Sequence, residues 1–101
     1  MTVPTGQDGR RLAQALVEEK LAACIQVLGP MQSSFHWQGK VEIAAEYLCL
    51  IKTTSDAFDR LKDRVKELHP YDVPELIAVP ITAGSEEYIA WLKSSVSGPE
   101  S

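Results

Sequence analysis

Side chains that bind soft metal ions are few in this sequence. Apart from two methionines, they are Cys24, Cys49, His36 and His69. Thiolate and imidazole together suit copper or zinc, and we predict Cys24 and His69 as the metal-binding pair. No pair among the four has the spacing of a recognised motif such as C-x-x-C, so these two side chains can meet only through the fold or across a subunit boundary. The alternative interpretation, a small buried thiol and a histidine at a helix terminus, stays open.

A short rigid linker follows His69. In the stretch "HPYDVPE" (69–75), Pro70 ends the preceding helix and Pro74 fixes the backbone before the next element. The intervening loop loses little entropy when it binds something. Such a loop suits the wall of a ligand pocket, and it equally suits a rigid contact between subunits, to which Tyr71 would bring a ring and a hydroxyl.

The composition excludes several function classes. The chain has 101 residues, the size of one domain, and we expect residues 1–101 to form one. A net charge of −4 disfavours nucleic acid as a partner. No stretch approaches the apolar length of a membrane span, and the N-terminus lacks the apolar region of a signal peptide. Together with two thiols in apolar surroundings, these features predict a cytoplasmic protein with no membrane association.

Signatures of catalysis are also missing. The segment "TAGSEE" has one glycine and no P-loop lysine, and no nucleophile elbow is present. We therefore predict that the protein is not an enzyme and requires no cofactor.

The hydrophobic pattern predicts the element order α-β-β-α-β-α. Helices are expected over residues 5–24, 55–69 and 85–96, capped by Thr5, by Thr54 or Ser55, and by Ser85. Strands are expected over 24–37, with a kink at Gly29-Pro30, over 40–54 after a turn at Gly39, and over 74–82. Residues 97–101 are expected to form a disordered tail.

These elements predict an α+β sandwich, with helices on one face of an antiparallel sheet. The ferredoxin-like pattern requires one more strand before the first helix, where this chain offers only residues 1–3. We therefore expect a truncated first strand.

The apolar run "YLCLI" (47–51) has a consequence for assembly. A strand that is apolar at every position is covered on both faces. One layer of helices covers only one face, so the other face requires a partner.

Several motifs resemble those of the CutA family, the divalent-cation tolerance proteins. In order they are "ALVEEKLAACIQVL", "FHWQGKVE", "IKTT", "HPYDVPELIAVPI" and "YIAWL", and the similarity extends over residues 2–96. The resemblance implies a ferredoxin-like protomer in a tight homotrimer that is similar to the trimers of PII signalling proteins. It also implies several further residues before "TVP" that form a central first strand.

The sequence differs from some family members at two cysteine positions. Some members have cysteines where this chain has Met1 and Arg64, and only Cys24 remains of that set. A multi-thiolate copper site within one protomer is therefore not expected.

The resemblance implies a trimeric divalent-cation tolerance protein, acting as a signalling module that binds a metal or a small ligand between subunits. We expect the inter-subunit cleft to involve Trp37, Lys52, Tyr71 and Glu75, beside the metal ligands Cys24 and His69. The alternative is a structural trimeric scaffold for another protein, with no ligand.

Overall fold

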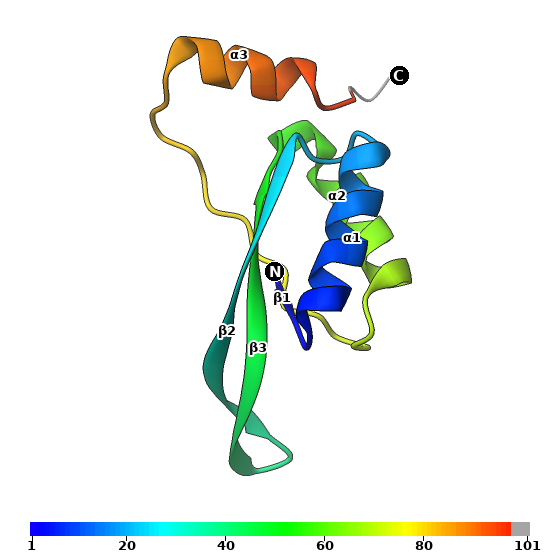
Figure 1. The fold of residues 1–101 in the computed structure, drawn as a ribbon, viewed down its shortest axis with the longest axis vertical. Helices are drawn as coiled ribbons and strands as arrows, with labels where there is room; N and C mark the ends of the chain where they lie inside the picture. Colours follow the sequence, from blue (N-terminus) through cyan, green and yellow to red (C-terminus); the bar gives the residue numbers. More distant parts are fainter. Residues whose placement is uncertain (98–101) are drawn as a thin grey trace.

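The computed structural model describes residues 1–97 (Figure 1). Its elements, in chain order, are β1 (Thr2–Val3), α1 (Gly6–Glu18), β2 (Cys24–Trp37), β3 (Lys40–Lys52), the short 3-10 helix η1 (Ser55–Ala57), α2 (Phe58–Leu68) and α3 (Glu86–Ser94). A long β2–β3 hairpin forms the body of the sheet, and α1 and α2 lie together on one side of it.

Helix α1 is positioned by its cap and by its apolar face. The Thr5 side chain accepts a hydrogen bond from the Asp8 N–H, as predicted for an N-cap. Leu12 and Leu16, one turn apart, are fully buried in the main core. This core lies between the helices and one face of the sheet.

The hairpin is long, antiparallel and irregular at one point. Its register pairs Cys24 with Lys52 at one end and Trp37 with Lys40 at the other, with a shift between Leu28 and Met31. The shift coincides with the predicted kink at Gly29-Pro30. The turn is tight, and Gly39 supplies its positive φ of 78°.

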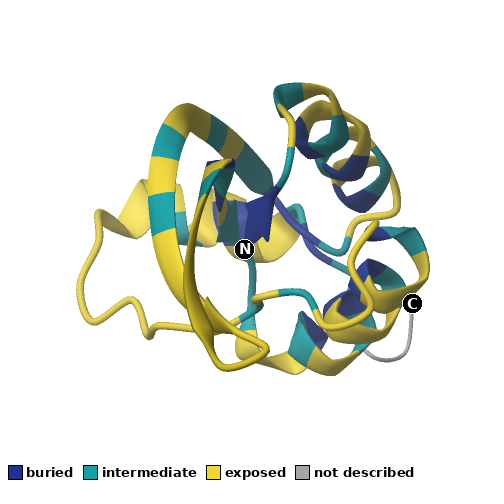
Figure 2. Ribbon diagram, turned by 90° about the horizontal axis from the view of Figure 1, so that it is seen from below, coloured by how far each residue is buried: buried dark blue, intermediate teal, exposed yellow. Residues whose placement is uncertain are grey.

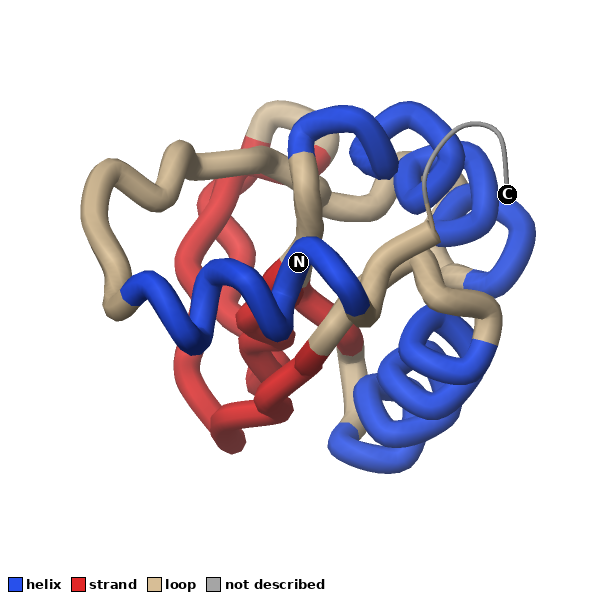
Figure 3. The backbone as a smooth tube through the Cα atoms, turned by 90° about the horizontal axis from the view of Figure 1, so that it is seen from above, coloured by secondary structure: helices blue, strands red, loops and turns tan. Residues whose placement is uncertain are grey.

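The later helices begin in different ways. Ser85 caps α3 through its side chain, as predicted. Neither Thr54 nor Ser55 caps α2: that helix grows out of η1, and Thr54, the residue before η1, makes no side-chain cap bond. The predicted cap is therefore wrong at this helix. In the 3-10 turn the Ala57 N–H already donates to the Thr54 carbonyl, and α2 continues directly from that turn. Helix α3 crosses one end of the molecule, where Leu92 packs in a second small core with Ala23 and Ala57 (Figure 3).

The fold class is confirmed as α+β with an antiparallel sheet. The first strand is short, as predicted, since β1 contains only Thr2 and Val3. The sheet order is β1-β3-β2, and β1 pairs with Leu48 and Tyr47 of β3.

The strand predicted over residues 74–82 is wrong. Residues 70–85 run without regular structure, and the described residues contain no strand after β3. A strand exists only with a hydrogen-bonding partner, and β1 is too short to extend alongside this segment. Ile77, Val79 and Ile81 consequently remain exposed. In Figure 2 the segment before α3 is coloured yellow, the colour of exposed residues.

The predicted tail falls largely outside the described residues. Residues 98–101 are not described, and Ser97 is held by its main chain: its N–H donates to the Lys20 carbonyl and its carbonyl accepts from Arg60. Among residues 1–97, no helix is both long and apolar enough to cross a membrane.

Candidate functional site

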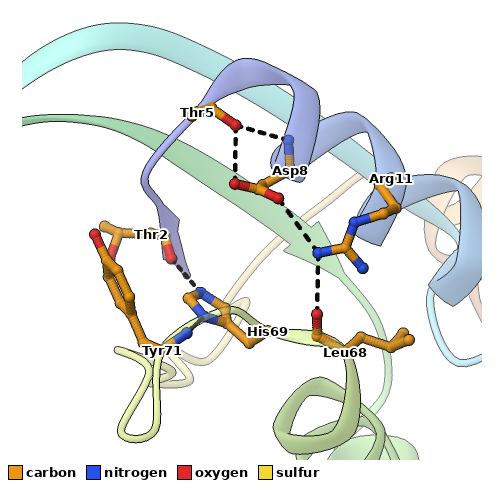
Figure 4. A network of polar contacts seen from close by, with 7 residues as sticks. All are labelled: Thr2, Thr5, Asp8, Arg11, Leu68, His69 and Tyr71. Carbon is orange, nitrogen blue, oxygen red and sulfur yellow. Dashed lines mark hydrogen bonds and ion pairs between the residues drawn. The ribbon is translucent and has the colours of Figure 1, made fainter.

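His69 lies at the centre of a buried polar cluster where the loop after α2 meets β1 (Figure 4). The residue is 7% exposed. Nδ1 accepts a hydrogen bond from the Tyr71 N–H (3.0 Å), and Nε2 lies 2.7 Å from the Thr2 carbonyl oxygen. Because Nδ1 is the acceptor, the proton of the neutral imidazole is on Nε2, which donates to Thr2. His69 therefore ties the loop to the first strand.

Tyr71 makes the second connection, to the sheet. Its hydroxyl donates to Glu46 Oε2 on β3 at 3.1 Å, and its ring lies 5.1 Å from that of His69. Glu46 is a buried carboxylate. Burial raises the pKa of the Tyr71 phenol, and the hydrogen bond and negative charge of Glu46 raise it further.

A third set of contacts, which the sequence analysis did not identify, joins α1 to the end of α2. Thr5 and Asp8 bond reciprocally, and Arg11 donates to Asp8 Oδ1 (3.3 Å) and to the Leu68 carbonyl (3.0 Å) (Figure 4). The spacing Thr-x-x-Asp resembles a capping box, and an arginine one turn later is placed to pair with its acid. That local signal was available, but the contact with Leu68 depends on the tertiary fold.

The cluster makes the loop after α2 rigid. Tyr71 is fixed through its main chain and its hydroxyl, between two prolines. Both nitrogens of His69 have partners, so a metal ion would displace one of these hydrogen bonds. Within residues 1–97, no group of three or more His, Cys, Asp and Glu side chains is arranged to hold a metal ion.

Cys24 and His69 do not meet within one chain. Cys24 is opposite Lys52, whereas Thr2, which binds His69, is opposite Leu48. Four residues of β3 separate these positions, about 13 Å along the strand. Metal bonds to sulfur and nitrogen are only about 2.0–2.3 Å long. A site that uses both side chains would need two chains, and it remains a prediction.

The other predicted residues are spread along the hairpin and the loop. Trp37 is 59% exposed at the hairpin tip, whereas Lys52 ends β3 at the far end and its Nζ donates to Gln26. Thirteen residues of strand, about 43 Å, separate Trp37 from Cys24. Glu75 lies on an apolar groove beside β3. Within one chain only His69 and Tyr71 come together, and a cleft containing the full set would need neighbouring chains.

The Tyr71–Glu46 hydrogen bond predicts a specific stability effect. Tyr71→Phe leaves the buried Glu46 carboxylate without this donor, and we expect the free energy of unfolding at neutral pH to fall by about 1–3 kcal/mol. Tyr88→Phe is the matched control, because Tyr88 is similarly exposed and its ring contact with Trp91 survives the change. Urea unfolding of both variants measures the difference. If Tyr71→Phe costs no more than Tyr88→Phe, the bond contributes nothing to stability.

The raised pKa of Tyr71 predicts the behaviour at alkaline pH. The phenol holds its proton more tightly in the folded protein than in the unfolded chain, whose ordinary pKa is 10.0. Its contribution to stability is therefore complete below that value and is lost as the pH rises through the folded pKa. From about pH 10 upward, Tm should fall more steeply with pH for the wild type than for Tyr71→Phe. If Tm falls equally with pH in both proteins, the raised pKa of Tyr71 does not contribute to stability.

The two thiols are expected to differ in reactivity. Cys49 is 2% exposed, and burial raises the pKa of its thiol, against the smaller effect of the terminal ammonium. Since only the thiolate reacts, Cys49 should react with a thiol reagent only after unfolding. In the Cys24→Ser variant Cys49 is the one remaining thiol, and its rate of reaction with the reagent is measured in the native protein. The same reaction in denaturant, where the thiol is exposed, is the control. Rapid labelling of the native variant would show that Cys49 is accessible.

Comparisons with known proteins agree with these features. Residues 1–95 match the family described as "CutA1 divalent ion tolerance protein". The chain is 50% identical over 95 residues to a divalent-cation tolerance protein CutA of Thermus thermophilus, covering 94% of this chain and 92% of that protein. It is 45% identical to a chloroplastic CutA protein of Arabidopsis thaliana, of which it spans about half, 52%.

Solved structures give the same result. The fold matches the divalent cation tolerance protein of Thermus thermophilus with a TM-score of 0.93 and 49% identity, covering 95% of this chain and 93% of that one. It matches a CutA from Archaeoglobus fulgidus, described as periplasmic, with a TM-score of 0.92 and 38% identity, covering 95% and 93%. This chain belongs to the CutA1 divalent ion tolerance protein family.

Proposed function

We propose that the protein acts as a homotrimeric divalent-cation tolerance protein of CutA type, a cytoplasmic signalling module that binds a metal ion or a small ligand between its subunits. The single observation that carries the proposal is an apolar surface on the β2–β3 hairpin that the described part of one chain does not cover.

The hairpin tip is apolar on both faces. Phe35 and Trp37 point to one face, and Val41 and Ile43 point to the other, because the antiparallel register places Phe35 opposite Glu42 and Ile43 opposite Ser34. All four are exposed, Val41 to 67%. The tip projects beyond α1 and α2 (Figure 1). Apolar patches of this kind mark interaction surfaces.

The middle of β3 also has an apolar side chain that is exposed in the single chain. Cys49 faces the helices and is buried, but its neighbour Leu50 faces the opposite side of the sheet and is 42% exposed. The apolar run "YLCLI" is therefore covered on one face within the chain. Symmetric copies of the chain supply the second cover, and the number three is what the family resemblance implies.

The rigid loop supports a binding role between subunits. His69 and Tyr71 fix it to two strands, so its exposed residues, Asp72 and Glu75, are presented in one conformation at little entropic cost. Groups from a neighbouring chain, including Cys24, Lys52 and Trp37, would complete the cleft around a copper ion, a zinc ion or a small anion.

Calorimetry tests the ligand-binding part of the proposal. Copper, zinc and small anions are titrated into the wild type, Cys24→Ser and Glu75→Gln, with Lys62→Gln on exposed α2 as the matched control. Binding that is weakened in Cys24→Ser and Glu75→Gln but kept in the control supports the inter-subunit site. Copper binding that is indifferent to Cys24→Ser removes Cys24 from it, and no binding of any probe favours the scaffold alternative.

A further inference from the structure

Lys52 is a cation without an acidic partner on the outer face of the hairpin, the face turned away from α1 and α2. It alternates with Leu50, which is exposed on that face, and it is itself half-buried. In the described part of the chain, the ion pairs join other residues, and no carboxylate forms one with Lys52. The proposed assembly covers this face, so the ammonium requires an anion there.

Gln26 adds hydrogen-bond donors beside this ammonium. It lies opposite Leu50, on the same face of the sheet, and its Oε1 accepts a hydrogen bond from Lys52 Nζ. An ammonium has three N–H donors and an amide nitrogen has two, so donors of both side chains remain available. The amide oxygen lies against the ammonium, where a second cation would be repelled. The two side chains together therefore suit the oxygen atoms of an anion.

The same arrangement disfavours a metal ion at Cys24. The register places Cys24 directly opposite Lys52, and side chains so placed have Cβ atoms about 4.5–5.5 Å apart. A metal ion bound to the sulfur would therefore lie close to a positive ammonium, and like charges at such a distance repel each other. Among the residues that the structure describes, no group of three or more metal-binding side chains offsets this repulsion.

We propose that Lys52 selects an anion over a metal cation at this end of the hairpin, and that the ligand of the proposed cleft is a small oxyanion, a phosphate or a carboxylate. The inference rests on the proposed function, of which it names the ligand class. The Lys52 ammonium and the Gln26 amide donate hydrogen bonds to the oxygens of the ligand. The Cys24 thiol lies beside the ligand and binds no metal ion.

Calorimetry of the full chain tests this selection with three probes, titrated separately: inorganic phosphate, malonate and zinc ion. Lys52→Met keeps an unbranched side chain but removes the charge. We expect this variant to bind the accepted oxyanion at least about tenfold more weakly than the wild type, and to bind zinc at least about tenfold more tightly. The comparison of phosphate with malonate shows which oxyanion the site accepts.

Three further variants separate charge from other effects of the substitution. Lys62→Met is the matched control, because Lys62 is an exposed lysine on α2, and it should change neither affinity. Lys52→Arg keeps the positive charge and should keep the binding of the oxyanion. Combining Cys24→Ser with Lys52→Met should abolish the added affinity for zinc, since the sulfur is the ligand that the loss of charge makes available.

Three results would overturn the proposal. They are no binding of either oxyanion, as when a carboxylate of a neighbouring chain already pairs with Lys52; equal oxyanion binding in Lys52→Met and Lys62→Met; and zinc affinity that does not change in Lys52→Met. Sedimentation of the same samples separates this inference from the proposed function. A folded single chain that binds phosphate through Lys52 would contradict only the assembly, whereas a trimer that binds zinc equally well with and without Lys52 would contradict only the selection of an anion.

Discussion

Val41→Glu is expected to dissociate the assembly into single chains. Val41 is exposed at the hairpin tip of one chain, where the proposed trimer covers it. A carboxylate buried there without a partner costs about 3–5 kcal/mol, which lowers association by two to four powers of ten at about 1.4 kcal/mol each. Light scattering behind a sizing column, at micromolar concentration, measures the change.

Val17→Glu is the matched control for this substitution. Val17 is also an exposed valine, but it belongs to α1 and not to the hairpin tip. The control should keep the mass of the wild type. If both variants keep that mass, the hairpin tip is not part of the interface.

Leu16→Ala is expected to lower the free energy of unfolding by about 2–5 kcal/mol. Leu16 is fully buried in the main core beside Leu12 and Val65, so truncation leaves a cavity that the rigid surroundings fill only in part. Urea unfolding measures the loss.

The neighbouring residue supplies the comparison. Val17→Ala removes apolar atoms from the same helix at a half-exposed position, and it should cost less than about 1 kcal/mol. A similar loss in both variants would mean that the change acts on the stability of the helix and not on the packing of the core.

Local sequence signals predicted most of the fold. Thr5 and Ser85 were identified as caps because a hydroxyl before an apolar-periodic segment has few other uses, and both accept the expected bond. Gly39 was assigned to the turn because only glycine adopts its φ without strain. These features depend on a few neighbouring residues, so the sequence alone determines them.

Features that depend on distant partners were predicted less well. Residues 74–82 have the composition of a strand, but a strand needs an adjacent edge, and β1 is too short to supply one. The sequence placed His69 and Tyr71 in one short rigid linker, and their rings lie 5.1 Å apart; their roles as metal ligand and cleft residue stay predictions. Glu46 and Arg11, which complete their surroundings, come from elements far away in the chain. The predicted inter-subunit cleft belongs to this same class, because its residues lie far apart in one chain.

Sedimentation equilibrium of the wild type, from high to low micromolar concentration, tests the central claim that copies of this chain cover one another's apolar sheet faces. A trimer should give a mass of about 33 kDa, three times the 11.1 kDa of one chain. The mass should stay constant on dilution, since an obligate interface of this kind does not dissociate in that range. A folded species of about 11 kDa at these concentrations would contradict the claim, and the proposed sites between subunits with it.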